Sequence, residues 1–360
     1  MRQLAMRQFR RIRELDLEVA PGFNVLVGAN AQGKTTVLEG IALLGTTQVL
    51  RGRRDADAIT SDCDEASVRG TLAESGTTLA MDLLRGARKR ASLNGLGLPR
   101  PSDLLGRFPV TTVTTEDLRL VRGEPSDRRL FLDLELSALS SAYLRDFGQY
   151  KRALEQRNAL LRRAREFFVP DEAFEPWEAM MAKAAETIRE WRAEYVVSLE
   201  KAAQPVQMGM GQGESLNLQY EANDDARTET DFLRAWSSSR GLDLQRGGTS
   251  VGPHRDDWAI VVDGRDARYY GSQGQQRTAV IGIKIASLAV AAERLGFTPM
   301  LLLDDMLSDL DETRRARLVS VVRERAAQAM LTCTESALAG PELLRSAAVF
   351  SVHDGRVTAL

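Results

Sequence analysis

A glycine-rich segment near the N-terminus has the sequence Gly28-Ala29-Asn30-Ala31-Gln32-Gly33-Lys34-Thr35, which matches the phosphate-binding pattern G-x-x-x-x-G-K-[ST] in full. Residues 23–27 before it are typical of a buried strand, and residues 35–44 after it are typical of a helix. Glycines let the backbone wrap around a phosphate, and amide groups at a helix N-terminus stabilise its negative charge. A glycine-rich turn arising by chance would lack these flanking elements. The segment therefore predicts a nucleotide site in an α/β fold.

Two side chains of this segment have expected roles in nucleotide chemistry. Lys34 would reach the β- and γ-phosphates, and Thr35 would be a ligand of Mg²⁺. The candidate nucleotide contacts are Gly28, Ala29, Asn30, Ala31, Gln32, Gly33, Lys34, Thr35 and Thr36. ATP and Mg²⁺ are the cofactors that this pattern implies.

An apolar stretch near the C-terminus ends in two carboxylates. Residues 300–303 are Met-Leu-Leu-Leu, and Asp304 and Asp305 follow. We expect Asp304 to hold Mg²⁺ and Asp305 to orient or deprotonate the attacking water. Many strands end in an acid, so the pattern alone is weak evidence for a metal site. It becomes strong evidence because the same chain contains the phosphate-binding segment. Residues 308–311 (Ser-Asp-Leu-Asp) could be only the start of a helix, where acids favour the helix dipole.

A small polar turn at residues 270–277, here called the signature segment, precedes the apolar residues 279–292. The apolar stretch contains no acid before Glu293, so its N-terminus is a second anion-binding end. An ordinary loop with a helix cap is the alternative. Its place ahead of the carboxylate pair makes the segment a candidate nucleotide contact. The residues concerned are Ser272, Gly274 and Gln275.

The composition limits the class of protein. The chain has 360 residues, of which 43% are hydrophobic and 27% charged, which excludes disorder and collagen-like structure. No apolar run approaches the roughly 20 residues of a membrane helix, and the N-terminus lacks a secretory h-region, so we expect a cytoplasmic protein without a membrane partner. Two cysteines and two histidines make a disulfide framework or a zinc site improbable.

Net charge −2 argues against a globally basic nucleic-acid binder. Nevertheless, 42 of the 48 basic residues are arginine. Arginine suits phosphate contacts, although an arginine-favouring genome explains the bias equally well.

The remaining chain divides by pattern. Residues 66–98 predict antiparallel strands with a turn at Asn94-Gly95, and a second hairpin turns at Asp263-Gly264. Helical spacing fills residues 128–203 and is interrupted near residues 169–176, which predicts a short antiparallel two-helix arm. Residues 209–248 are expected to be a polar return connection with a helix at residues 231–237.

We therefore expect an α/β ATPase head made from both ends of the chain. Its parts would be residues 1–120, with the phosphate-binding segment and antiparallel strands, and residues 245–360, with the signature segment and the carboxylate pair. Residues 121–244 would form an inserted helical lobe with the arm.

The order of these motifs resembles the head of ABC-type P-loop ATPases, with a mixed sheet, flanking helices and an antiparallel β subdomain. Within that superfamily the chain resembles the RecF family of bacterial recombination mediators, an SMC-like group. The stretch Gly252-Pro253-His254-Arg255-Asp256-Asp257 is typical of this family rather than of ABC ATPases in general. Other matching stretches lie at residues 23–28, 116–118, 128–133, 271–277 and 302–311.

This resemblance implies an ATP-dependent homodimer in which two protomers sandwich two ATP molecules. Ser272, Gly274 and Gln275 would contact the γ-phosphate held by the partner's phosphate-binding segment, and residues 308–311 would cross the interface. The family binds double-stranded DNA and its junctions with single strands, and acts with RecR and RecO in gap repair and the SOS response. A weak, DNA-stimulated ATP hydrolase is the implied activity, with hydrolysis releasing the DNA clamp.

Two departures separate the chain from transporter-type ATPases. Asp305 stands where such proteins usually have Glu, and residues 331–335 (Leu-Thr-Cys-Thr-Glu) stand where a switch histidine would follow. A threonine hydroxyl there could contact the γ-phosphate. A transporter ATPase is therefore disfavoured, and a small-molecule kinase would leave the signature segment and the arm without a role. A scaffold that binds ATP without turnover remains open.

Several charged residues have two interpretations. The candidate DNA contacts, all on the expected head, are Arg51, Arg53, Arg54, Arg88, Lys89 and Arg90. The arm arginines, including Arg157, are expected to form a solvated face. His254 is either a buried structural residue or one that responds to nucleotide or DNA, and Arg128-Arg129 either a solvated helix start or a phosphate contact.

Overall fold

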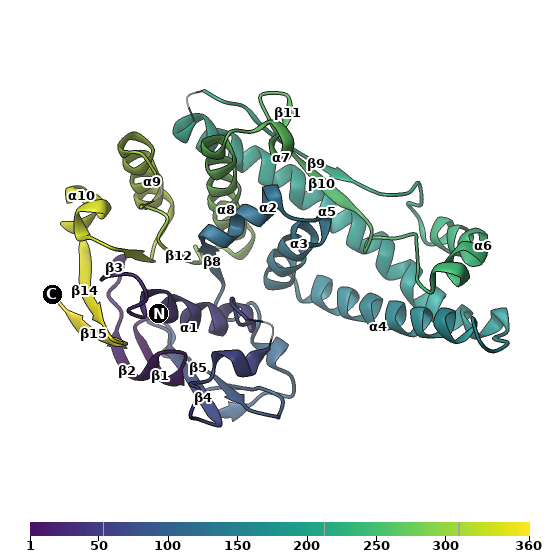
Figure 1. Ribbon diagram of the computed structural model, residues 1–360, viewed down its shortest axis with the longest axis horizontal. Coiled ribbons are helices and arrows are strands. Elements are labelled where there is room, and N and C mark those ends of the chain that lie inside the picture. Colours follow the sequence, from purple (N-terminus) through teal and green to yellow (C-terminus); the bar gives the residue numbers. More distant parts are fainter. Residues whose placement is uncertain (53, 212, 309) are drawn as a thin grey trace. The chain divides into compact units, whose positions relative to one another are not determined.

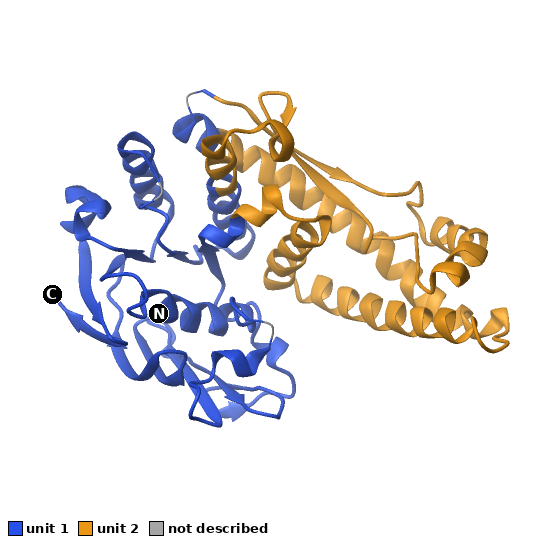
Figure 2. Cartoon of the chain, viewed as in Figure 1, with its two compact units in different colours: residues 1–117, 205–213, 281–360 blue, residues 118–204, 214–280 orange. Residues whose placement is uncertain are grey.

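The computed structural model describes residues 1–52, 54–211, 213–308 and 310–360. The chain forms two compact units (Figure 2). Unit 1 contains residues 1–117, 205–213 and 281–360, and unit 2 contains residues 118–204 and 214–280. The division falls within two helices, α5 (Glu175–Met210) and α8 (Gln273–Leu295).

The boundaries differ from those expected, because residues 245–280 belong to unit 2 rather than to the head. The cause is a strand that the sequence pattern missed. β9 (Leu216–Glu221) lies in the supposed polar connection and pairs antiparallel with β10 (Asp257–Val262) along its whole length. This pairing fixes the family-typical stretch of residues 252–257 within unit 2.

A mixed sheet forms the centre of unit 1 and positions the nucleotide site (Figure 1). In spatial order its strands are β15 (Arg356–Ala359), β14 (Ala347–His353), β3 (Phe23–Val27), β13 (Ala329–Cys333), β12 (Met300–Leu303) and β8 (Val110–Val113). All neighbouring pairs are parallel except β14 and β15. The carboxyl ends of β3, β12 and β13 therefore meet at one edge, where ligands of such sheets bind.

An antiparallel sheet forms the second layer of unit 1. Its order is β2 (Ile12–Glu18), β1 (Gln3–Phe9), β4 (Glu65–Thr71), β5 (Thr78–Leu84), β6 (Arg90–Leu93) and β7 (Leu96–Gly97). The predicted hairpin turn at Asn94-Gly95 is confirmed, since both residues have positive φ, 51° and 79°.

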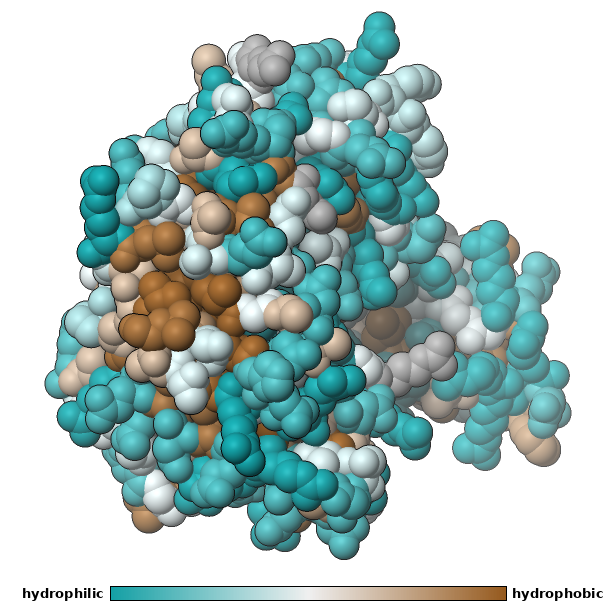
Figure 3. Space-filling model, turned by 60° about the vertical axis from the view of Figure 1, so that its left-hand side comes forward, coloured by the Kyte–Doolittle hydropathy of each residue, from teal (hydrophilic) through white to brown (hydrophobic). Residues whose placement is uncertain are grey.

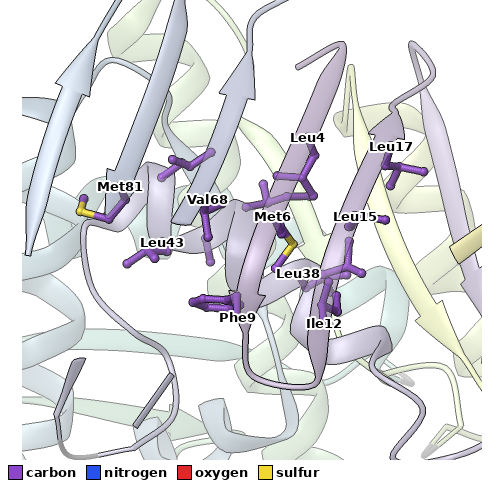
Figure 4. Close-up of a cluster of buried hydrophobic side chains, with 14 of the residues drawn as sticks. Leu4, Met6, Phe9, Ile12, Leu15, Leu17, Leu38, Leu43, Val68 and Met81 are labelled. Carbon is purple, nitrogen blue, oxygen red and sulfur yellow. The ribbon is translucent and has the colours of Figure 1, made fainter. Parts of the chain in front are cut away.

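Helix α1 (Lys34–Thr46) lies in the hydrophobic core that joins the two sheets. Figure 4 shows Leu38 and Leu43 of this helix among side chains of the antiparallel sheet such as Met6 and Val68. Leu302 of β12 belongs to the same core, whereas its neighbours in sequence pack on the opposite face. Both faces of the mixed sheet are thus buried, which explains the uninterrupted apolar run of residues 300–303.

The opposite face of the mixed sheet is covered by α8 and by α9 (Glu312–Arg325). Residues Ile281, Ile285 and Leu288 of α8 pack there against Leu301 and Leu303. Shorter elements complete unit 1: η1 (Asp55–Ala58), η2 (Pro101–Leu104), η5 (Ser336–Ala339) and α10 (Gly340–Leu344). The turn η3 (Thr115–Leu118) leads into unit 2.

Unit 2 is mainly helical. The predicted arm is present as α4 (Ser141–Arg163) and α5, joined through the turn η4 (Asp171–Ala173). The other elements are α2 (Arg119–Arg122), α3 (Pro125–Leu139), α6 (Glu229–Arg246), α7 (Ala267–Tyr270) and the two-residue strand β11 (Arg265–Asp266). The helix expected at residues 231–237 is longer than predicted, and the strand returning from the Asp263-Gly264 turn is shorter.

The expectation of a solvated arginine face on the arm holds for Arg152, Arg162, Arg163 and Arg165, which are exposed, but it is wrong for Arg157. Arg157 is fully buried, where its guanidinium lies 2.8 Å from carboxylate oxygens of both Glu178 and Asp243. Arg189 on α5 pairs in the same way with Asp224 and Asp256, at 2.7 Å each. Such residues pack inside because each charge has an opposite partner.

Arg128 and His254 also have structural partners in unit 2. Arg128 binds the Asp257 carboxylate through two hydrogen bonds of 2.7 Å, so it is neither solvated nor free for phosphate. His254 is held between the Tyr150 hydroxyl, 2.7 Å from Nδ1, and the Thr249 carbonyl oxygen, 3.0 Å from Nε2. Burial lowers the pKa of His254 from 6.5 to about 4, so its ring is neutral at pH 7.

The surface is largely hydrophilic, with one group of hydrophobic residues on the face that Figure 3 presents. Within the described ranges, none of the helices has the length and apolar character needed to cross a membrane.

Candidate nucleotide-binding site

The phosphate-binding segment connects β3 to α1, as the sequence predicts. Two of its glycines are required by geometry. A Cβ on Gly28 would lie 2.3 Å from the Val352 carbonyl oxygen, and Gly33 has φ +112°, which side chains rarely adopt. The backbone of the loop therefore packs closely against the neighbouring strand β14.

The Lys34 ammonium is turned back onto its own loop. Nζ donates to the Gly28 carbonyl at 2.6 Å and to the Ala29 carbonyl at 3.0 Å. These contacts keep the cation at the centre of the loop. A charge held there is available to phosphate oxygens, because hydrogen bonds to a charged acceptor are stronger than those to carbonyls.

Thr35 and Asp304 meet at the edge of the mixed sheet although 269 positions separate them in sequence. The Thr35 hydroxyl lies 2.8 Å and 3.0 Å from the two oxygens of Asp304. A hydroxyl and a carboxylate at this spacing are oxygen ligands of the type that Mg²⁺ prefers. The donor set therefore fits the expected metal, held between the phosphate-binding segment and the end of β12.

Thr332 at the end of β13 contacts the Asp304 carboxylate and the Asp305 backbone. Its hydroxyl donates to Asp304 at 2.9 Å and accepts from the backbone N–H of Asp305 at 2.8 Å. Asp305 has φ +52°, and its carboxylate accepts from Ser308 at 2.6 Å. The threonine near the expected switch position thus binds the acids, a role different from the γ-phosphate contact considered from the sequence.

A pocket of about 450 Å³ opens beside these groups. Its walls include Arg10, Arg11, Asn30, Ala31, Gly33, Lys34, Thr35, Thr36, Glu39, Arg51 and Asp305. Of the predicted loop residues, Gln32 is instead tied to the β14–β15 turn, because its side-chain oxygen accepts from the backbone N–H of Asp354 at 2.7 Å. The pocket combines cationic, hydroxyl and carboxylate groups, which suits a nucleoside phosphate with a metal.

Three pocket residues form a cluster that sequence reasoning did not assign to nucleotide binding. Arg51, proposed above as a DNA contact, forms an ion pair with Asp304 at 3.0 Å, and Arg10 pairs with Glu39 at 3.2 Å. Burial raises the pKa of the Glu39 carboxyl, although the guanidinium groups of Arg10 and Arg51 lower it. No motif marks Arg10, because its position depends on the tight turn between β1 and β2, where its φ is +56°.

The signature segment lies in unit 2 at the start of α8, with Ser272 exposed. Ser272 and Gln275 cap the helix reciprocally. The Gln275 side chain accepts from the Ser272 N–H at 2.9 Å, and the Ser272 hydroxyl accepts from the Gln275 N–H at 3.2 Å. Gly274 occupies the first turn. The segment therefore presents a preformed helix N-terminus.

The segment after the carboxylate pair ends in a helix cap. Asp311 is the N-cap of α9 and accepts from the Arg314 N–H at 2.9 Å. Asp309 lies outside the described residues. Hence the simple interpretation of Asp311 as a cap is confirmed, whereas a role at an interface stays a prediction.

The remaining candidate DNA contacts have different surroundings. Arg54, Arg88 and Arg90 are exposed, whereas Lys89 pairs with Asp55 at 3.0 Å. Arg53 lies outside the described residues. Arg90 also lines a second pocket of about 260 Å³ on the antiparallel sheet, together with Arg7, Arg69 and the acids Glu65 and Asp82.

Comparison with known proteins places these features in a family. Residues 1–356 match the family model described as RecF/RecN/SMC N terminal domain. The DNA replication and repair protein RecF of Geobacillus thermodenitrificans is 34% identical over 368 residues, covering 99% of this chain and 98% of the relative. The protein of the same name from Listeria welshimeri is 34% identical over 366 residues and covers 99% of each chain.

Solved structures agree with this relationship. The recombination mediator protein RecF-ATP of the RecFOR pathway superposes with a TM-score of 0.90 at 29% identity, covering 100% of this chain and 97% of that one. The structure of RecF-ATPrS superposes with a TM-score of 0.89 at 28% identity and the same coverage of both chains. The Smc head domain of Pyrococcus furiosus shares the fold, with a TM-score of 0.56 at 15% identity. The match covers 100% of this chain and 96% of that one. The expected ABC-type α/β head with an inserted helical lobe is thereby confirmed.

Proposed function

Because the chain belongs to the RecF family of the RecF/RecN/SMC group, we propose that it is an ATPase that binds DNA and acts in DNA replication and repair. The role in DNA replication and repair is taken from the names of the relatives. The observation that carries the nucleotide chemistry is the 2.8 Å contact between Thr35 and Asp304. It joins two motifs from opposite ends of the chain into one site for phosphate and metal.

The proposed reaction is hydrolysis of ATP to ADP and phosphate. Lys34 binds the β- and γ-phosphate oxygens, and Asp305 orients the attacking water and accepts its proton. Thr35 and Asp304 would hold Mg²⁺, which would supply positive charge to neutralise the phosphate oxygens. Asp305 is one methylene shorter than the usual Glu, which is compatible with slow turnover.

Hydrolysis in this proposal needs a second copy of the chain. Ser272, Gly274 and Gln275 contact the γ-phosphate bound by the partner's loop, so each ATP is shared between two protomers. Their exposed, capped helix N-terminus supports this role, since such an end favours anions. ATP binding, dimerisation and DNA binding are then thermodynamically linked.

The proposed DNA is a duplex or a junction between duplex and single strand, with RecR and RecO as protein partners. Among the candidate contacts, Arg54, Arg88 and Arg90 retain exposed side chains. Phosphate contacts of this kind give affinity without sequence specificity, and the affinity falls as salt rises. Arg51 is better assigned to the nucleotide pocket, because it faces Asp304.

Light scattering at low micromolar protein tests the shared site. We expect a monomer with ADP, a dimer with ATP and Mg²⁺, and a monomer with ATP for Ser272→Arg. Ser237→Arg on the exposed face of α6 is the matched control and should dimerise normally. A wild-type monomer with ATP, with or without duplex DNA, would contradict the proposal.

A pair of variants separates ATPase from scaffold. Lys34→Ala should abolish ATP-driven assembly, and Asp305→Asn should accumulate the dimer, because the nucleotide binds without being hydrolysed. If Asp305→Asn hydrolysed ATP at the wild-type rate, the assigned role of this carboxylate would be wrong.

A further inference from the structure

Helix α7 presents two adjacent tyrosines directly before the signature segment. The exposed fraction of Tyr269 is 72% and that of Tyr270 is 70%. Tyrosine is enriched in protein interfaces, since its ring supplies a large apolar area and its hydroxyl a hydrogen bond. Two such side chains on a four-residue helix form a small, prominent surface.

The backbone of α7 is fixed to the first turn of α8. The buried Gln276 amide donates to the carbonyl oxygens of Ala267 at 2.8 Å and of Arg268 at 3.3 Å, and its oxygen accepts from Arg122 at 2.6 Å. A Cβ on Gly271 would lie 2.6 Å from the Ala267 carbonyl oxygen, so the connection is close-packed. The tyrosines therefore keep a constant position relative to the signature segment.

Arg268 holds α7 from its other side. Its guanidinium pairs with Glu124 at 3.1 Å and lies 5.6 Å from the centre of the Tyr269 ring. Rigid aromatic side chains lose little conformational entropy on binding, so a surface of this type binds a partner efficiently.

The chain length limits how far the tyrosines lie from Ser272. At no more than about 3.6 Å per residue, the Cα atoms of Tyr270 and Tyr269 lie within about 7 Å and 11 Å of that of Ser272. A stable interface covers about 800 Å² per partner, a disc of roughly 16 Å radius. An interface of this size centred on Ser272 therefore extends as far as both tyrosines.

We propose that Tyr269 and Tyr270 are anchor residues through which this chain contacts a second copy of itself in the ATP-bound state. The inference rests on the proposed function, because it takes the shared nucleotide site to include Ser272. The second copy is favoured over DNA by this continuity and by the neighbouring charges, since Arg268 beside the tyrosines is already paired with Glu124.

Nitration of the wild-type protein tests the contact without a variant. Of the six tyrosines, only Tyr269 and Tyr270 are exposed. Burial raises the pKa of Tyr143, Tyr150 and Tyr220, so their phenols do not ionise and react slowly. We expect tetranitromethane to modify the peptide with Tyr269 and Tyr270 at least about fivefold more slowly with a non-hydrolysable ATP analogue and Mg²⁺ than with ADP. An unchanged rate would overturn the inference.

The double variant Tyr269→Ser/Tyr270→Ser gives the energetic measurement. By sedimentation equilibrium with the same analogue, we expect dimerisation to weaken at least about 30-fold, as for anchor residues of interfaces. Binding of a fluorescent ATP analogue to the monomer should stay within twofold. Phe168→Ser, at a 92% exposed residue after α4, is the control and should dimerise as the wild type does.

The outcomes separate this inference from the proposed function. If the wild type and the double variant dimerise equally, the tyrosine contact is overturned and the shared site stands. If the double variant dimerises normally but loses duplex affinity, the tyrosines contact DNA and the inference is wrong. A wild type that stays monomeric with nucleotide overturns both.

Discussion

The nucleotide pocket of unit 1 and the interior of unit 2 are made from the same residue types, arginine and aspartate, in opposite states of exposure. Arg51 in the pocket pairs with Asp304 while 45% of its side chain stays exposed. Arg157 in unit 2 is fully buried between Glu178 and Asp243. The first pair borders an open volume that a ligand can enter, whereas the second is enclosed.

Exposure therefore decides which role the pair has. In the pocket, incoming phosphate can replace the existing partner of an arginine, because solvent lowers the cost of separating the charges. In unit 2 no such exchange is possible, since an unpaired buried charge costs several kcal/mol. The same chemistry thus borders an open pocket in one unit and holds helices together in the other.

The largest effect is expected where a buried charge loses its partner. Arg157→Ala should reduce the free energy of unfolding by about 3–5 kcal/mol, because Asp243 stays buried without its guanidinium and Glu178 keeps only that of Arg240. Urea denaturation followed by circular dichroism measures the change. Arg152→Ala, on the exposed side of α4, is the matched control, with an expected change of less than about 0.5 kcal/mol. Equal effects of the two variants would remove the distinction between enclosed and open arginines.

In the pocket, loss of a cation should weaken ligand binding and leave the free energy of unfolding almost unchanged. Lys34→Ala should weaken binding of a fluorescent ATP analogue about 100-fold, or about 2.7 kcal/mol, because charge-assisted phosphate contacts are lost. Its stability should change little, since Lys34 contacts only two loop carbonyls. Lys201→Ala, on the exposed surface of α5, should bind the analogue normally. An affinity within threefold of wild type for Lys34→Ala would refute the phosphate assignment.

The pH dependence of stability tests whether His254 is buried in its neutral form in unit 2. The pKa of His254 is lowered from 6.5 to about 4 in the folded chain, so the unfolded chain binds more protons between these values and stability falls as pH falls through this window. From pH 7 to pH 5 the wild type should lose about 2 kcal/mol more than His254→Gln. Urea midpoints at both pH values, for both proteins, provide the measurement. Parallel losses would mean that His254 is not buried in its neutral form.

The smallest effect concerns the Thr332 hydroxyl, which binds the Asp304 carboxylate and the backbone N–H of Asp305. Thr332→Val should slow single-turnover ATP hydrolysis about tenfold, or about 1.4 kcal/mol, with nucleotide affinity changed less than threefold. Thr332 acts by positioning Asp304 and Asp305, so Thr332→Ser should restore the rate. A Ser variant as slow as the Val variant would show that packing, and not the hydroxyl, matters.

Contiguous motifs made it possible to predict, from the sequence, the residues that meet at the candidate nucleotide site. Gly28–Thr35 and the pair Asp304-Asp305 are short runs whose chemistry depends on the flanking strand and helix, which local patterns reveal. The turn at Asn94-Gly95 was equally local. By contrast, Arg10 and Glu39 line the same pocket without any motif, because separate elements of the fold bring them together.

The helical lobe resisted prediction for a related reason. Spacing indicated a helix in the region of α4, but it did not show that Tyr150 and Arg157 lie on the buried face. An arginine is expected to be exposed unless carboxylates pair with it inside the fold. The carboxylates that pair with Arg157 lie on α5 and α6, far away in sequence. Strand β9 does carry a local signal, because Leu216, Leu218 and Tyr220 alternate with polar residues, but the run is short and lies in the polar stretch of residues 209–248. Its pairing with β10 then fixes it as a strand.

The sequence by itself determined the phosphate-binding segment, the acids at the end of β12, the two-helix arm and the family. These depend on local backbone requirements and on residue types at fixed spacing. The tertiary structure alone decided which arginines are enclosed, which ones line the pocket, and that residues 245–280 pack in unit 2. Those outcomes depend on partners distant in sequence, because the free energy of a charge is set by whatever surrounds it after folding.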